Sequence, residues 1–342
     1  MVTHPTEINV LDQALAVRFY GVRPKVGAVP LVVHFHGGAF VQGGLDSGST
    51  IARLIAEAGA VVVSLDYPLA PDHPFPQAAD SGYAALQWAH KHRAKLAGEH
   101  APVFVAGEEA GGNLAAAVTL MVRDQRQPPL AGQILLSPML NPCLGTASLR
   151  AVDAGVKGCR WADGWKQYLS QVGDCTHPYA APGPSMRLGE LPPTLLLTAG
   201  DDPFKDESLD YARRLRAAGV KVKDAVLPAP TGWPCSCMNP DSHEAPWAES
   251  VRQHVQQFWP HSTHRLLSRE SHHEEPPPQH PQLGHWHRRH GPHRRHGGLL
   301  RSAFARCQGQ CIRDGRPPSH TSLRGCCGRH RCGHLGRVLG PA

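Results

Sequence analysis

Residues 107–114 read Gly-Glu-Glu-Ala-Gly-Gly-Asn-Leu, between a short apolar run at 101–106 and a helix-forming run at 114–122. Strand, tight glycine turn and helix follow one another in this order in a nucleophile elbow, G-x-S-x-G, whose middle residue is held in a strained conformation above the sheet. Glu109 stands where that motif has serine. Taken alone, the octapeptide is also compatible with a glycine-rich loop of any α/β protein.

A second glycine motif, His-Phe-His-Gly-Gly-Ala-Phe at 34–40, follows the apolar run 29–33. Glycine allows backbone N–H groups to come close to a developing negative charge, so such a loop after a central strand can form part of an oxyanion hole. We expect Gly37 and Gly38 to supply donors there. Ala110, the residue after the elbow, is expected to supply another.

Four motifs in the same order carry a resemblance to a known family. HGGAF at 36–40 resembles HGGGF, and residues 66–76 (DYPLAPDHPFP) resemble DYRLAPE-x-PFPA. Residues 107–115 resemble GDSAGGNLA, and 191–207 resemble an LPP…DPLRDE stretch. The chain thus resembles the hormone-sensitive-lipase-like branch of the α/β-hydrolase fold, a group of carboxylesterases and lipases, from about residue 14 to about 259. The resemblance implies that fold and the hydrolysis of carboxylic esters.

The catalytic positions implied by the resemblance depart from the family pattern. The family has a serine, an aspartate and a histidine in that chain order. Here Glu109 stands at the serine position and Asp202 at the acid position. The histidine is expected after the last strand-like run, 220–227, where this chain has Thr231. Both residues that carry out the proton-coupled attack are therefore replaced, which leaves catalysis open.

One possible repair is that Glu109 acts as a carboxylate nucleophile. Related α/β-hydrolases use an aspartate on the elbow in this way, but a glutamate carries its oxygens one carbon farther out. Hydrolysis of the covalent intermediate also needs a base. His243 is the weak alternative base, because it lies between the last strand and the closing helix, and its loop would have to be rearranged. A solvent-exposed loop histidine is the plainer interpretation.

A second hypothesis concerns charge. The carboxylate of Glu109 is placed beside N–H donors, and charge-assisted hydrogen bonds to backbone N–H groups are strong, so it can fill the oxyanion hole itself. Glu108 matches an acidic position of the family motif and is interpreted as structural. The alternative function is therefore a non-catalytic pseudoenzyme that binds a small acyl or carboxylate ligand in the inherited pocket. The plant gibberellin receptors, which resemble this family and lack its histidine, are a comparable case.

The hydrophobic pattern predicts an α/β fold, with a mostly parallel, doubly wound sheet and helices on both faces. Strand-like runs occur at 29–35, 60–65, 102–106, 132–137, 194–199 and 219–227, and helix-like stretches at 48–58, 77–97, 112–126, 206–218 and 245–259. The resemblance implies that the stretch 143–190 is a cap-like insertion, in which Trp161 and Trp165 either pack a helix or line the pocket. The first strand-like run, 15–20, begins early, which predicts a reduced cap and a more open pocket.

The sequence changes character near residue 260. Residues 1–260 carry 21 Lys or Arg and 24 Asp or Glu, a net charge of −3, whereas residues 261–342 carry 14 Arg and 4 Asp or Glu, a net charge of +10. We expect one α/β-hydrolase domain at 1–260 and a disordered Arg/His/Pro/Gly/Cys-rich tail at 261–342. Three interpretations of the tail compete, namely nucleic-acid binding through arginine pairs, metal binding through cysteines and histidines, and an out-of-frame continuation of a GC-rich coding sequence. The third is favoured, because no nucleic-acid module or zinc spacing accompanies the charges.

Partners and location follow from what the sequence lacks. No cofactor or metal motif is recognised, and neither specific nucleic-acid binding nor a membrane span of about 20 apolar residues is expected. The expected partner is a small-molecule ester or acyl ligand, with a possible homodimer, since members of this family often pair through a sheet edge and the last helix. The first residues, Met1 to Glu7, do not resemble a signal peptide, and the expectation is a cytoplasmic protein with reduced thiols.

Overall fold

An eight-stranded sheet organises the part of the chain that the computed structural model describes, residues 2–151, 157–171 and 173–259. The strands are β1 (Thr6–Val10), β2 (Gln13–Tyr20), β3 (Leu31–Phe35), β4 (Val61–Leu65), β5 (Val103–Glu108), β6 (Gly132–Leu136), β7 (Thr194–Ala199) and β8 (Val222–Leu227). Their order in the sheet is β1-β2-β4-β3-β5-β6-β7-β8. β2 pairs antiparallel with β1 and β4, and the pairs from β4 to β8 are parallel.

The central strands are buried on both faces. Every residue of β3, β4, β5, β6 and β7 is buried, which explains why these strands read as continuous apolar runs rather than as alternating patterns. β8 forms one edge of the sheet and is mostly exposed or half-buried. The mostly parallel sheet that the sequence predicted is therefore confirmed.

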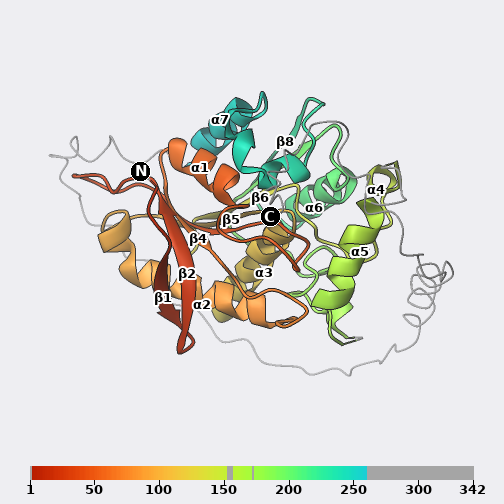
Figure 1. The fold of residues 1–342 in the computed structure, drawn as a ribbon, viewed down its shortest axis with the longest axis horizontal. Coiled ribbons are helices and arrows are strands. Elements are labelled where there is room, and N and C mark those ends of the chain that lie inside the picture. Colours follow the sequence, from red (N-terminus) through yellow and green to blue (C-terminus); the bar gives the residue numbers. More distant parts are fainter. Residues whose placement is uncertain (1, 152–156, 172, 260–342) are drawn as a thin grey trace, which may run out of the picture. The chain divides into compact units, whose positions relative to one another are not determined.

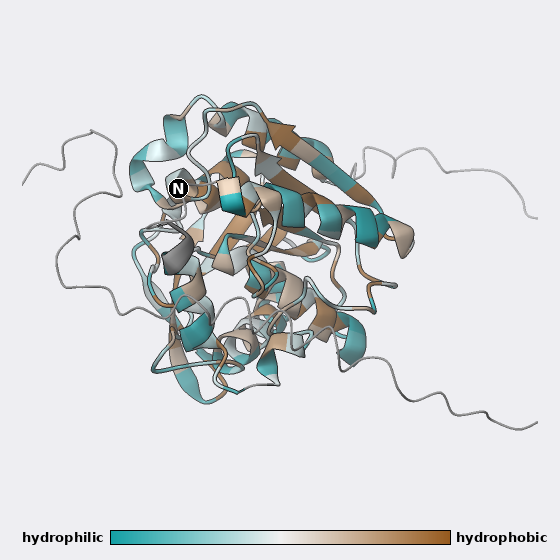
Figure 2. Ribbon diagram, turned by 90° about the vertical axis from the view of Figure 1, so that its right-hand side faces the viewer, coloured by the Kyte–Doolittle hydropathy of each residue, from teal (hydrophilic) through white to brown (hydrophobic). Residues whose placement is uncertain are grey.

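Helices cover both faces of the sheet. They are α1 (Ser49–Glu57), α2 (Gln77–Leu96), α3 (Ala110–Gln125), α4 (Ala147–Ala151), α5 (Lys157–Tyr168), α6 (Lys205–Ala217) and α7 (Ala248–Phe258), with short 3-10 turns η1 (Asp174–Thr176), η2 (Cys235–Met238) and η3 (Pro240–Glu244). α1 and α7 share one hydrophobic cluster with one face of the sheet, and α2, α3 and α6 share the other. In Figure 1, α1 and α7 lie on the opposite side of the strands from α2 and α3. In Figure 2, hydrophobic colouring follows the strands, and the surrounding helices carry much of the hydrophilic colouring.

Two parts of this architecture were not expected from the sequence. β1 forms a hairpin with β2 through Leu11 and Asp12, whose φ angles are +50° and +59°. Two-residue hairpin turns are usually recognised in a sequence by Asn-Gly or Asp-Gly, so the Leu-Asp pair did not indicate a hairpin here. The helices α4 and α5 lie inside the predicted cap-like stretch 143–190, for which no helix bounds were predicted.

Other expectations fall partly outside the described residues. All the strands and helices above lie within the predicted domain 1–260, and the predicted tail at 261–342 lies outside the described part of the chain. In the described part, no helix combines the length and the apolar character needed to span a membrane. Within the same residues, no group of three or more His, Cys, Asp or Glu side chains is placed to hold a metal ion.

Candidate active site

The strand–turn–helix expected around residue 109 is present. β5 ends at Glu108, α3 begins at Ala110, and Glu109 between them has φ +52° and ψ −116°, which is unusual for a residue with a side chain. A Cβ atom at Gly107 would lie 2.2 Å from the carbonyl oxygen of Gly111, so the turn admits only glycine there. The strained conformation aims the Glu109 side chain from the carboxyl end of the sheet at the glycine loop after β3.

One carboxylate oxygen of Glu109 is held by backbone N–H groups. Oε2 accepts from Gly38 N at 2.5 Å and from Ala39 N at 2.7 Å, with a longer contact to Ala110 N at 3.4 Å. Hydrogen bonds from N–H to a carboxylate are charge-assisted and short. We call these three donors, from Gly38, Ala39 and Ala110, the N–H cradle.

The N–H cradle differs in one member from the donors expected from the sequence. Gly38 and Ala110 donate to Glu109 as expected, but Gly37 N donates to Oε1 of Glu108 at 3.0 Å instead. Ala39 takes its place, with φ +52°. The role of Ala39 could have been inferred from the sequence. It stands where the HGGGF motif has its third glycine, and glycine is the residue that tolerates a positive φ without strain.

The cap helix α5 closes over the other oxygen of Glu109. The indole Nε1–H of Trp161 donates to Oε1 at 2.6 Å, and the Arg160 guanidinium lies 3.7 Å from the same oxygen. α5 can come this close because residue 164 is glycine, at which a Cβ atom would lie 2.2 Å from the carbonyl oxygen of Ala39. Of the two tryptophans weighed from the sequence, Trp161 therefore contacts the site, whereas Trp165 packs against Phe40 with ring centroids 4.9 Å apart.

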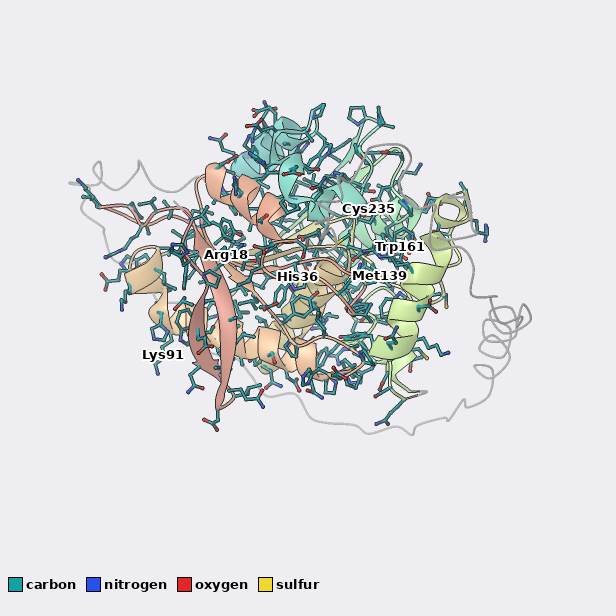
Figure 3. The ribbon with its side chains drawn as sticks, viewed as in Figure 1. Arg18, His36, Lys91, Met139, Trp161 and Cys235 are labelled. Atoms are coloured by element: carbon teal, nitrogen blue, oxygen red, sulfur yellow. The ribbon has the colours of Figure 1, made fainter. Side chains whose placement is uncertain are left out.

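Burial of the site corrects one expectation. Glu109 is 0% exposed and Trp161 is 2% exposed, so the more open pocket predicted from the short N-terminal region is not found at the elbow. Figure 3 shows His36, Met139, Trp161 and Cys235 in the same part of the fold. Met139 N donates to the backbone oxygen of Glu109 at 2.9 Å, so the segment that follows β6 also holds the elbow in place.

A second buried carboxylate, Glu108, supports the loop that carries the N–H cradle. Its Oε2 lies 2.8 Å from Nε2 of His34, and Nδ1 of His34 lies 3.0 Å from Oγ of Ser64, all three side chains being fully buried. Burial raises the pKa of Glu108, and the His34 ring opposes that shift. With Gly37 N–H held by Glu108, the next two N–H groups are turned toward Glu109. The structural interpretation of Glu108 agrees with these contacts.

The acid position is occupied by a buried and fully engaged side chain. Asp202 accepts from Thr198 Oγ1 at 2.6 Å, from Ser137 Oγ at 2.8 Å and from Phe204 N at 2.9 Å. Burial raises the pKa of Asp202, and these hydrogen bonds act in the opposite direction. None of these partners is Thr231.

Thr231 instead contacts the preceding residue, Asp201. Its N and Oγ1 donate to Asp201 at 2.8 and 2.7 Å, and Gly232 N adds a third bond at 2.8 Å. Burial acts to raise the pKa of Asp201, but these three hydrogen bonds lower it, and the pKa is lowered on balance. The structure thus places Thr231, the predicted histidine position, next to Asp201. The sequence motif had indicated the adjacent residue, Asp202, as its partner.

His243 does not join the site through any of its described contacts. It lies in η3, with Nδ1 3.3 Å from Pro240 O and Nε2 3.6 Å from Glu244 Oε1. Sequence reasoning missed η2, which packs on the glycine loop: a Cβ atom at Gly37 would lie 2.4 Å from Sδ of Met238. Cys237 beside it is fully buried, and burial raises the pKa of its thiol.

Comparison with known proteins places this geometry in a family. A family model described as alpha/beta hydrolase fold matches residues 32–229, more than half of the chain. The chain belongs to the α/β-hydrolase fold family. Several relatives and structural neighbours are named as esterases or carboxylesterases, and others as gibberellin receptors, so this α/β-hydrolase is a member of the branch that resembles carboxylic ester hydrolases.

Three relatives illustrate the range of the match. The esterase LipI of Mycobacterium tuberculosis is 35% identical over 234 residues, which are 64% of this chain and 72% of LipI. The gibberellin receptor GID1C of Arabidopsis thaliana is 34% identical over 209 residues, 57% of this chain and 60% of the receptor. The solved structure of a hyperthermophilic esterase from the archaeon Pyrobaculum calidifontis superposes with a TM-score of 0.65 at 32% identity, covering 75% of this chain and 85% of that one.

Proposed function

We propose that this α/β-hydrolase is a non-hydrolytic member of its family, in which Glu109 occupies the place of a reacting ester oxygen. The observation that carries the proposal is the N–H cradle, whose donors all point at Oε2 of Glu109. An oxyanion hole lowers the barrier of acyl transfer only when its donors can bind the oxygen of the substrate. Because a carboxylate already takes these donors, we expect no ester oxyanion to be stabilised there.

The proton chemistry of ester hydrolysis is also missing its base. A serine nucleophile needs a neighbouring group that accepts its proton near neutral pH, usually histidine. Position 231 offers a threonine hydroxyl that donates to Asp201, and Asp202 is engaged by two hydroxyl groups and one N–H. The elbow and the acid side thus both lack a group that could start the reaction.

A carboxylate-nucleophile hydrolase is the second candidate function, and the contacts of Glu109 argue against it. Both of its oxygens already accept hydrogen bonds, one from the N–H cradle and one from Trp161. Breakdown of a glutamyl ester would need a base to activate water, and the described contacts of His243 involve only Pro240 and Glu244. Intact mass spectrometry after exposure to an ester would reveal such an intermediate as an acyl adduct.

The positive role that we propose is small-molecule binding in the pocket inherited from the family. A gibberellin receptor among the relatives supports this, because the family includes a protein named for a receptor function. Of the two ligand classes expected from the sequence, acyl and carboxylate, the contacts favour a neutral acyl group. Three buried acidic side chains, those of Glu108, Glu109 and Asp202, belong to the elbow and the acid position, so a carboxylate ligand would meet like charge there.

The test measures hydrolysis of p-nitrophenyl acetate and butyrate by the full chain and by Glu109→Gln. That variant keeps the shape of the side chain and removes its charge. We expect both proteins to give the rate of the buffer alone. Turnover by the unmodified chain that disappears in Glu109→Gln would contradict the proposal and establish a carboxylate-dependent hydrolase.

The binding role is tested separately by thermal unfolding with ethyl butyrate and with butyrate as matched probes. A ligand that binds only the folded state raises the melting temperature with its concentration. We expect ethyl butyrate to raise it and butyrate to leave it unchanged. An equal or larger shift with butyrate would contradict a neutral acyl site.

A further inference from the structure

Three surface depressions adjoin one another at the amino-terminal ends of β5, β6 and β7, on the edge of the sheet opposite to Glu109. The first two share Arg123, Arg126 and Glu190, and the second and third share Pro129 and Leu130. Their volumes are about 350, 350 and 360 Å³. Lys91 lies in α2 between the lining residues His90 and Arg93. Figure 3 shows it on the opposite side of the molecule from Trp161, which contacts Glu109. We call these three adjoining depressions together the basic groove; its arginine lining residues are Arg93, Arg123, Arg126 and Arg187.

The basic groove carries positive charge that its own surroundings do not neutralise. Against the four arginines stand two acidic lining residues, and one of these, Asp124, pairs with Arg123 at 2.9 Å. Within the described residues, no ion pair engages Arg93, Arg126 or Arg187. Residues 1–260 have a net charge of −3, so this groove is a local cationic site on an acidic domain.

The basic groove is lined by both polar and apolar residues, and its described lining contains no Phe, Trp or Tyr. Its accessible apolar lining comes from Met186 and Pro129, which are exposed, and from Leu130, which is half-buried. Further prolines stand at 102, 128 and 192. Single-stranded nucleic acids are held by aromatic side chains on which bases stack. Aliphatic and proline surface between arginines suits instead a peptide in which acidic and apolar side chains alternate.

We propose that the basic groove is a docking site for an acidic, leucine-containing peptide segment of a partner protein. Arg126 and Arg187 are exposed and would pair with carboxylates of the peptide, while its apolar side chains rest on Leu130 and the prolines. The segment 261–342 of this chain has a net charge of +10 and therefore does not fit as the occupant. The proposal is independent of the chemistry at Glu109.

The test is photo-crosslinking of the full chain with a synthetic peptide of roughly a dozen residues that alternates Glu and Leu around a central benzoylphenylalanine. A peptide with Lys in place of Glu is the matched control. Cross-linked sites are located by mass spectrometry, which separates binding at the groove from binding to the arginines of 261–342. We expect cross-links at 122–130 and 186–192 with the Glu peptide and none there with the Lys peptide.

Substitutions identify the charges responsible. Arg126→Glu with Arg187→Glu should lower the groove cross-link yield about tenfold, because removing charge complementarity weakens encounter and binding. Arg23→Glu with Lys25→Glu, at two exposed positions outside the groove, is the charge-matched control and should leave the yield unchanged. If the first pair lowers the circular-dichroism signal of folding, Arg126→Gln with Arg187→Gln replaces it, and the same loss is expected.

Three results would overturn the proposal. The first is cross-linking confined to 260–342. The second is an equal loss of groove cross-links in both charge-reversed pairs. The third is competition by a single-stranded oligonucleotide at lower concentration than by the unlabelled Glu peptide, which would assign the groove to nucleic acid.

Discussion

The two ends of the central sheet treat their charged groups in opposite ways. At the carboxyl end, both oxygens of Glu109 accept hydrogen bonds and the side chain is 0% exposed. At the amino end, Arg126 and Arg187 face solvent without an ion partner among the described residues. Charged groups that satisfy one another stabilise a closed structure, whereas charged groups left facing water remain available to a partner. The comparison shows that residues at the positions of a catalytic centre need not be the residues that are accessible to a binding partner.

The largest effect is expected where the carboxyl end depends on a buried pair. Glu108→Ala removes the partner of His34 and of Gly37 N–H and leaves both buried without an acceptor. We expect the free energy of unfolding to fall by about 4 kcal/mol, since two buried polar groups lose their partner and each unsatisfied group costs about 1 to 3 kcal/mol. Urea denaturation measures this. Glu57→Ala, which removes a largely exposed carboxylate paired with Arg252, is the matched control and should change it by less than about 1 kcal/mol.

Glu109 itself should contribute to stability rather than to catalysis. Glu109→Ala leaves the donors of the N–H cradle and the indole of Trp161 without their acceptor. We expect a loss of about 3 kcal/mol in the free energy of unfolding, because an unsatisfied buried donor costs about 1 to 3 kcal/mol. Glu109→Gln retains acceptor oxygen and should lose less. If Glu109→Ala were as stable as the unmodified chain, the contacts of Glu109 would carry no stabilisation.

A pH dependence is expected from Glu207, a buried carboxyl beside the acid position. Burial raises its pKa from 4.5 to about 8, while Leu140 N–H opposes the shift. The folded state therefore keeps a proton that the unfolded chain has released, and stability present below about pH 4.5 is lost as the pH rises toward 8. Between pH 5 and 7 we expect the free energy of unfolding to fall by about 2 kcal/mol from this group.

The comparison with Glu207→Gln isolates that contribution. The amide oxygen of glutamine can still accept from Leu140 N–H, and it does not titrate. Burial lowers the pKa of His36 to about 4, so its contribution to the stability of the protein is lost as the pH falls. This effect is the same in both proteins. The difference between the two stability curves should therefore shrink toward low pH. Parallel curves from pH 5 to 8 would show that Glu207 is ionised in the folded state.

The smallest effect is expected at Asp201, which holds the loop after β8 from a partly exposed position. Asp201→Asn keeps one acceptor oxygen but weakens the bonds from Thr231 and Gly232. We expect a loss of about 1 kcal/mol, typical of a single hydrogen bond. Asp210→Asn, an exposed carboxylate on α6, serves as the control. A loss as large as that of Glu108→Ala would mean that this loop supports the whole carboxyl end.

Local sequence patterns predicted the scaffold of the candidate site well. The sheet, the elbow and the loop at 36–40 follow from short-range features, namely apolar runs bounded by glycines, and all are found in the structure. The contact of Trp161 with Glu109 could not be deduced in this way, because it depends on how closely α5 packs against Ala39. The pairing of Thr231 with Asp201 rather than Asp202 depends on which of two adjacent side chains faces the loop after β8. Such orientations arise from tertiary packing and leave no trace in spacing.

The central claim, that the carboxylate of Glu109 fills the N–H cradle, can be tested directly by nuclear magnetic resonance of the amide protons. Strong charge-assisted hydrogen bonds should move the Gly38 and Ala39 amide protons downfield, and Glu109→Gln should move both back upfield. Gly37, whose N–H donates to Glu108, is the internal control and should hold its position. If the Gly38 and Ala39 resonances are the same in the two proteins, Glu109 does not occupy the cradle, and the account of a self-filled site is wrong.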